Sequence, residues 1–172
     1  MGNSNLNPTT INNLNFLKSN SLILSEPEEF NYKESIRAEK RKMKLFSKHN
    51  EDAKDSELIE NCLLNHFFFK LLEKPAIYEI VRQVSYYKIN RGIEIFMQSM
   101  PPGYFFILSK GSCEIIVDGE VKKKIESGAC FGELSLIYGC NREYTVKTLE
   151  ESFVWAMEKK NFMKIADHIN NM

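Results

Sequence analysis

Hydrophobic positions between residues 57 and 67 recur with the period of an α-helix. A stripe of this kind predicts a helix with one buried face, and its members are Leu58, Ile59, Cys62, Leu63, His66 and Phe67. Ser56 precedes the stripe and is a suitable N-cap residue. A second short helix is predicted from Pro75 to Val84, since proline in the first turn loses no hydrogen bond. Because His66 lies on the apolar face, we interpret it as a packed core histidine and not as a ligand.

Beyond Val84 the pattern changes from helical to strand-like. Seven of the eight glycines lie between residues 92 and 139, and they separate short runs rich in strand-forming residues. The runs are Val84–Ile89, Ile93–Met97, Tyr104–Ser109, Glu114–Asp118, Val121–Ile125, Thr145–Leu149 and Phe153–Met157. Short strands with a turn about every 8–12 residues indicate an antiparallel barrel or sandwich. Asp118-Gly119 suits a type I′ hairpin turn.

From Lys159 on, the apolar spacing predicts one closing helix. The predicted fold is therefore mainly β with flanking helices. It is an antiparallel β-roll (a double-stranded β-helix, jelly-roll-like) with N-terminal helices and one C-terminal helix.

The first 55 residues have a different composition. Seven asparagines fall within the first twenty residues, and with so few apolar neighbours the segment cannot offset its ordering entropy. We therefore expect residues 1–32 to form a disordered asparagine-rich tail. Residues 33–48 hold seven basic and two acidic residues, whereas residues 51–60 hold five acidic residues and one lysine. We interpret residues 33–55 as a charged linker or helix held near its acidic neighbour. The alternative is a docking segment, including a kinase-directed pseudosubstrate around Lys44-Leu45-Phe46-Ser47.

Composition and charge argue against several classes of protein. The chain has 23 basic and 23 acidic residues, and a dedicated nucleic-acid binder normally shows a basic excess. No apolar run reaches the roughly 18 residues of a membrane span. The N-terminus lacks the basic start and apolar core of a secretory signal. We therefore expect a cytoplasmic chain with no nucleic-acid partner and no membrane span.

The sequence shows no spacing typical of a catalytic or metal centre. Its four cysteines, expected to be reduced thiols, are Cys62, Cys113, Cys130 and Cys140, and they lack paired metal-site spacing. The three histidines lie outside the predicted strands, at positions 49, 66 and 168, which argues against a metal centre inside the roll. Neither a Ser-His-Asp set nor a P-loop is present. We therefore expect no enzyme activity, no catalytic residue, no metal and no cofactor.

One segment interrupts the strand pattern. It reads Cys130-Phe131-Gly132-Glu133-Leu134-Ser135-Leu136 and predicts a strand end, a glycine and a short helix. Unpaired N–H groups at a helix N-terminus attract an anion, and Gly132 permits close approach of a ligand. Arg142 can form a bidentate pair with phosphate, whereas Glu133 would be repelled by phosphate unless it meets hydroxyl donors. The segment therefore favours a ligand with both a phosphate and a sugar hydroxyl.

This segment resembles the phosphate-binding motif in the cyclic nucleotide-binding domains of cAMP- and cGMP-dependent protein kinases. The family motif is F-G-E-L-[AS]-L followed by R-x-[AS]-T, and here Phe131–Leu136 and Arg142–Thr145 stand at those positions. The resemblance covers about residues 56–170, so we interpret residues 56–172 as such a domain. It implies that Glu133 accepts the ribose 2′-OH, that Arg142 pairs with the cyclic phosphate and that Gly132 sits against the ribose. The remaining cradle groups that it implies are the backbone N–H groups of Leu134, Ser135 and Tyr144.

The chain departs from the family pattern directly after the arginine. Family members usually carry Ala, Ser or Thr and then a small residue, whereas this chain has Glu143 and Tyr144. Glu143 places a second anion near the phosphate unless it turns to solvent, and it can accept a hydrogen bond from the guanine 2-amino group. Tyr144 is bulky where the backbone should approach the ligand, and it can stack on the base. We therefore expect a slight preference for cGMP over cAMP.

The resemblance implies a ligand-gated regulatory module, most simply of a protein kinase system, that binds cGMP or cAMP. The motifs of a kinase catalytic domain are missing from the sequence, so we expect any kinase regulation to act in trans on a kinase catalytic chain, unless this sequence is a fragment of a longer protein. The alternative is a degenerate cyclic nucleotide-binding fold that serves as a nucleotide-independent protein-interaction domain.

Overall fold

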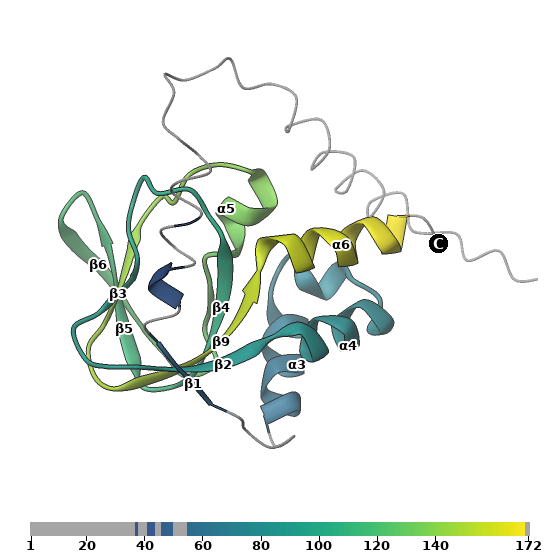
Figure 1. Ribbon diagram of the computed structural model, residues 1–172, viewed down its shortest axis with the longest axis horizontal. Helices are drawn as coiled ribbons and strands as arrows, with labels where there is room; N and C mark the ends of the chain where they lie inside the picture. Colours follow the sequence, from purple (N-terminus) through teal and green to yellow (C-terminus); the bar gives the residue numbers. More distant parts are fainter. Residues whose placement is uncertain (1–36, 38–40, 44–45, 50–54, 171–172) are drawn as a thin grey trace, which may run out of the picture.

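The computed structural model describes residues 37, 41–43, 46–49 and 55–170 of the chain. The predicted tail, residues 1–32, and much of the charged segment 33–55, with Lys44 and Leu45 of the suggested pseudosubstrate, lie outside the described residues. The helices α3 (Ser56–Asn65) and α4 (Lys74–Gln83) precede most of the strands, and α6 (Lys159–Asn170) follows them. This confirms the predicted order of N-terminal helices, β-roll and C-terminal helix (Figure 1).

The strands pair antiparallel throughout and form two sheets. Their bounds are β1 Ser47–His49, β2 Ser85–Ile89, β3 Glu94–Phe96, β4 Tyr104–Lys110, β5 Ser112–Val117, β6 Glu120–Glu126, β7 Cys130–Phe131, β8 Thr145–Thr148 and β9 Ser152–Glu158. One sheet has the order β1-β2-β9-β4-β7, and the other has the order β3-β8-β5-β6. The seven predicted strand runs are all present, with ends that differ by at most two residues.

The folded unit begins earlier than the predicted boundary at residue 56. In the segment expected to be a linker or helix, β1 pairs with β2, and Lys48 lies opposite Tyr87. Met43 and Phe46 are buried between the two sheets. The outer edge of β2 offers unpaired backbone groups that a further strand can satisfy, and two large apolar side chains anchor that strand.

The predicted N-cap of α3 is displaced by one residue. Asp55, and not Ser56, is the N-cap residue, and its side chain makes no capping hydrogen bond. Its Oδ2 atom instead accepts hydrogen bonds from Ser109 Oγ at 2.9 Å and from Trp155 Nε1 at 3.0 Å. These bonds tie the start of α3 to β4 and β9, which explains why the carboxylate is diverted from capping.

Two hydrophobic cores lie on opposite faces of the five-stranded sheet. The inter-sheet core includes Phe96, Phe106 and Phe131. The helical core joins α3, α4 and α6 to the other face of β4 and β9, through side chains such as Phe69 and Phe162. Figure 1 shows these three helices together on one side of the roll. The short helix η3 (Phe69–Leu71) connects α3 to α4 within this core.

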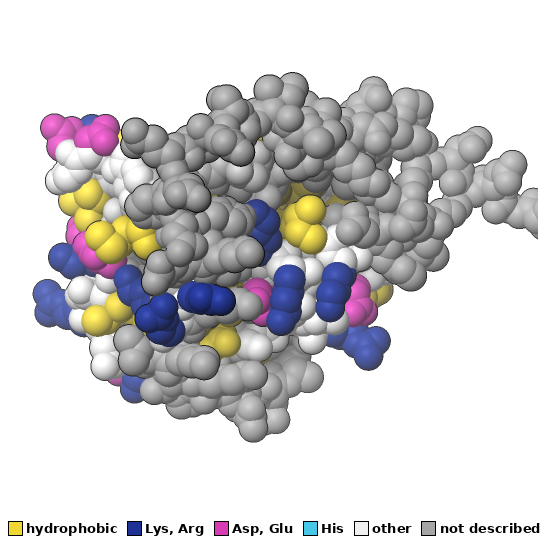
Figure 2. All heavy atoms as spheres, turned by 45° about the horizontal axis from the view of Figure 1, so that its top comes forward, with side chains coloured by type: hydrophobic (Ala, Val, Ile, Leu, Met, Phe, Trp, Pro, Cys, Tyr) yellow, Lys and Arg dark blue, Asp and Glu magenta, His cyan; other side chains and the backbone are white. Residues whose placement is uncertain are grey.

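The surface of the roll shows how the sheets end. Asp118 and Gly119 both have positive φ, at 52° and 81°, which agrees with the predicted type I′ turn between β5 and β6. The edge strand β6 exposes Lys122, Lys123 and Lys124, and lysines on an edge discourage pairing with other chains. Figure 2 shows basic side chains on this side of the roll and hydrophobic ones in small separate groups. No described helix is long and apolar enough to cross a membrane.

Candidate functional site

The segment that interrupts the strand pattern forms a strand end, a glycine turn and a short helix, as predicted. β7 pairs with β4 and ends at Phe131, and α5 (Glu133–Tyr138) begins after Gly132. Leu136 and Ile137 of α5 are buried in the helical core, which fixes this short helix against β4. We call residues 130–144 the cassette.

Gly132 is required by both its conformation and its surroundings. Its φ of +81° lies in the left-handed region, where other residues are strained. A Cβ atom at this position would lie 2.8 Å from Arg142 Nη1 and 3.0 Å from Phe96 Cε1. Glycine is therefore the residue that lets the guanidinium approach the backbone of the cassette.

Arg142 points into the roll and is only 2% exposed. Its Nη1 donates to the Gly132 carbonyl oxygen at 2.6 Å, and its Nη2 donates to the Tyr104 carbonyl oxygen at 2.5 Å. Its Cζ atom lies 4.0 Å from the centre of the Phe96 ring, a cation–π contact. Ser135 Oγ lies 3.5 Å from Nη1. The structure thus brings together Arg142, Gly132 and Ser135, three of the residues that the resemblance implies for the ligand site.

Glu133 contacts the residue that ends α3. It is 5% exposed, and its Oε1 accepts a hydrogen bond from His66 Nε2 at 3.0 Å. His66 Nδ1 accepts from the Phe68 N–H at 3.3 Å, which leaves Nε2 as the ring nitrogen that donates to Glu133. Glu133 Oε2 is buried and has no hydrogen-bond partner among the described residues. The His66 ring packs against that of Phe69, with centres 5.0 Å apart, as expected for a packed core histidine, and it also contacts a predicted site residue.

Tyr144 lies across the cassette. Its Oη accepts a hydrogen bond from the Gly132 N–H at 3.1 Å, and its ring centre is 5.6 Å from that of Phe96. Burial, followed by the negative charge of Glu133, raises the pKa of Tyr144 to about 12. The Tyr144 side chain thus bonds to the residue that the resemblance places against the ribose.

The other predicted residues lie around this centre. Leu134 is half-buried on α5, and Glu143 is exposed to solvent. The thiol of Cys140 has a raised pKa, owing to burial first and to the charge of Glu143 second. Glu143 is therefore separate from the buried contacts of Arg142, although it is the next residue along the chain.

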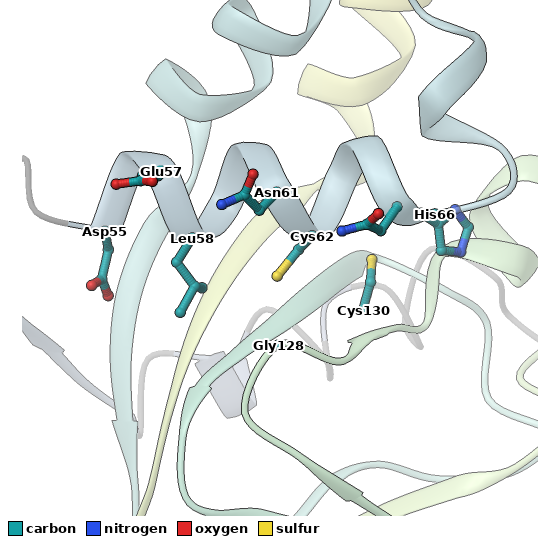
Figure 3. Close-up of a pocket in the computed structure, with 9 residues that line it drawn as sticks. Asp55, Glu57, Leu58, Asn61, Cys62, His66, Gly128 and Cys130 are labelled. Carbon is teal, nitrogen blue, oxygen red and sulfur yellow. The ribbon is translucent and has the colours of Figure 1, made fainter.

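A groove of about 640 Å³ lies between α3 and the start of β7, next to the cassette (Figure 3). Polar side chains of α3 line it together with His66, Cys62 and Cys130. The pKa of the Cys130 thiol is raised well above its ordinary value by burial, and further by the charges of Glu133 and Cys62. Nothing in the sequence indicated this meeting, because His66 and Glu133 are 67 residues apart in the chain.

The chain matches the family model described as cyclic nucleotide-binding domain over residues 87–168. It is 27% identical over 142 residues to cGMP-dependent protein kinase 2 of Mus musculus, covering 83% of this chain and 17% of that protein. It is 28% identical over 116 residues to a cAMP-dependent protein kinase regulatory subunit of Yarrowia lipolytica, covering 67% of this chain and 31% of that protein. The chain therefore spans less than a third of the length of these relatives.

Solved structures agree on the fold. The regulatory domain of Toxoplasma gondii PKA with cAMP superposes with a TM-score of 0.61 at 24% identity, covering 71% of this chain and 49% of that one. The regulatory subunit of a cAMP-independent protein kinase A from Trypanosoma cruzi, bound to guanosine, gives 0.60 at 19% identity, covering 69% and 43%. Over residues 87–168 the chain is therefore similar to cyclic nucleotide-binding domains, and the relatives that it resembles are a cGMP-dependent protein kinase and a cAMP-dependent protein kinase regulatory subunit.

Proposed function

We propose that this domain binds cGMP or cAMP at the cassette, with a slight preference for cGMP, and thereby regulates a protein kinase catalytic chain. The observation that carries the proposal is the placement of Arg142. Its guanidinium is buried and lies against Gly132 and Ser135, where the family motif expects a cyclic phosphate. The role is binding and not catalysis.

Binding requires an exchange of hydrogen bonds. The two residues expected at the ribose are already engaged inside the protein, because the Gly132 N–H bonds to Tyr144 and Glu133 bonds to His66. A nucleotide that takes both must replace these bonds with its own. Ligand shifts the protein toward the opened arrangement only by its differential affinity for the two arrangements. In the proposed module, this exchange of hydrogen bonds is the step that couples nucleotide binding to the change in protein structure.

The main test is calorimetry with cAMP and cGMP. Arg142→Ala should weaken binding by about 2–4 kcal/mol, or roughly 30- to 1,000-fold, because a charge-assisted phosphate contact is lost. Arg91→Ala is the matched control, since Arg91 is exposed and lies outside the cassette. If the alanine variant does not fold, Arg142→Lys can replace it. Lysine keeps the positive charge but lacks the planar guanidinium that pairs with phosphate through two hydrogen bonds.

The preference for cGMP depends on Glu143. This carboxylate is exposed, so it can turn toward the 2-amino group of a bound guanine. Glu143→Ala should lower affinity for cGMP more than affinity for cAMP in the same calorimetric assay. An equal loss for both nucleotides would remove the reason for favouring cGMP.

The second candidate is a protein-interaction domain that binds no cyclic nucleotide. It is favoured by the same two internal bonds, because Tyr144 and His66 engage the Gly132 N–H and Glu133 Oε1 without a ligand. The absence of binding heat with either nucleotide at millimolar concentration would support this candidate against the first.

A further inference from the structure

A second cluster of chemically active side chains lies behind the cassette. The ligand-type atoms of His66, Cys130 and Glu133 all lie within 4.8 Å of one another. They come from the end of α3, from β7 and from the first residue of α5, so the cluster joins the N-terminal helices to the cassette. Among the described residues, Glu133 Oε2 has no hydrogen-bond partner although its side chain is only 7% exposed.

We propose that His66, Cys130 and Glu133 bind one Zn²⁺ ion, with a water molecule at the fourth position. An unsatisfied buried carboxylate oxygen is costly, and a cation placed beside it removes that cost. Imidazole, thiolate and carboxylate are the usual zinc ligands. The thiolate excludes Mg²⁺ and Ca²⁺, which take oxygen ligands.

The geometry needs only small movements. Zinc bonds of 2.0–2.3 Å in a tetrahedron place ligand atoms about 3.3–3.7 Å apart, compared with 3.0 Å between His66 Nε2 and Glu133 Oε1 and at most 4.8 Å for any pair. Cys130 must release its thiol proton to solvent when the ion binds. Nε2 must pass its proton to Nδ1, which ends the contact with the Phe68 N–H. That contact is long, at 3.3 Å, so it opposes metal binding only weakly.

An ion can reach the cluster from solvent. His66 and Cys130 line the groove beside α3, and Asp55 and Glu57 line it farther along (Figure 3). Acidic side chains along such a path raise the local concentration of cations. The open fourth position would face this groove.

Spacing in the sequence did not indicate the site because its three ligands come from two distant segments. Cys130 and Glu133 are three residues apart around Gly132, and His66 directly follows α3, 64 residues before Cys130. This is not the spacing of a known zinc motif, so the expectation of no metal followed from the sequence alone. Only the packing of the end of α3 against the cassette brings the two segments together.

The test is a titration of the reduced, chelator-treated full chain with Co²⁺, followed by displacement with Zn²⁺. We expect one ion per chain, with a thiolate-to-cobalt absorption band in the near ultraviolet. Cys130→Ser should remove the band and weaken binding by more than about 100-fold, above the loss typical of an outer-shell partner. Cys140→Ser is the matched control and should retain the full spectrum.

His66→Gln provides a second variant, because glutamine can still donate to Glu133 and keep the fold while removing a metal ligand. A cobalt spectrum without a thiolate band, or one unchanged by Cys130→Ser or by His66→Gln, would overturn the assignment. Arg142→Ala should leave the cobalt spectrum intact while weakening nucleotide binding, so failure of the zinc site and failure of the nucleotide site are distinguishable.

Discussion

Replacing Tyr144 with phenylalanine tests the hydrogen bond between the Tyr144 hydroxyl and the Gly132 N–H. The change removes the hydroxyl that accepts from the Gly132 N–H at 3.1 Å. It leaves the ring, which packs against Phe96 with centres 5.6 Å apart, and it leaves the backbone N–H of residue 144. The variant therefore loses one hydrogen bond of the nucleotide-free state and little else.

The size of the effect follows from that single bond. A neutral hydrogen bond contributes about 0.5–1.5 kcal/mol net. If the nucleotide must break this bond before it reaches Gly132, its removal should tighten binding by the same amount. The expected gain for Tyr144→Phe is about 2- to 13-fold, for cAMP and cGMP alike. The nucleotide-free protein should lose a similar free energy of unfolding.

Two measurements on one pair of proteins check this reasoning. Calorimetry gives the affinities, and urea unfolding without nucleotide gives the stabilities. Tyr78→Phe serves as the control, since Tyr78 is exposed on α4 outside the cassette. Weaker nucleotide binding by Tyr144→Phe would show that the hydroxyl contacts the ligand. An unchanged affinity alongside reduced stability would show that the bond persists in the complex. Either result refutes the exchange.

Two further predictions concern stability. In urea titrations, Gly132→Ala should lower the free energy of unfolding more than Gly139→Ala does. Both glycines have a positive φ, at +81° and +66°, and alanine in that conformation costs about 1–2 kcal/mol. Only at Gly132 would the new Cβ atom also meet another side chain, because it would lie 2.8 Å from Arg142 Nη1. If both variants lost the same free energy of unfolding, the contact between the new Cβ atom and Arg142 would be relieved without cost. The raised pKa of Tyr144, about 12 against an ordinary 10.0, means that the folded state keeps the phenol proton longer than the unfolded chain does. The contribution of this pKa shift to the free energy of unfolding is complete below pH 10 and is lost as pH rises toward 12. Between these pH values the free energy of unfolding should therefore fall less steeply with pH for Tyr144→Phe than for the unchanged protein. If the free energy of unfolding fell equally steeply with pH in both proteins, a group other than Tyr144 would be responsible for the loss.

The sequence predicted most of the fold because its local signals are strong. Glycines between short apolar runs marked the strands of the roll, and the Asp118-Gly119 turn has the expected backbone. β7 has two residues and β1 has three, too few for an alternation pattern to register. β1 forms because β2 offers a free edge and because Met43 and Phe46 anchor the strand in the inter-sheet core, and neither cause is a pattern within residues 47–49.

The candidate site was predicted in part. The motif identified Gly132, Ser135 and Arg142, which the structure places together, because their spacing is set by one turn and one short helix. It gave no sign that Tyr144 would bond back to Gly132 or that His66 would contact Glu133. Both contacts arise from packing between segments, and no local periodicity encodes them.

The burial of α5 has a mechanical consequence. Leu136 and Ile137 belong to the helical core, in the same cluster as Ile59 of α3, Ile77 of α4 and Phe162 of α6. Protein interiors are close-packed, so a helix cannot withdraw two side chains from such a cluster without opening a void. Any ligand that shifts α5 must therefore change the packing of α3, α4 and α6 as well. Binding at the cassette would then alter the surface that these helices present to solvent.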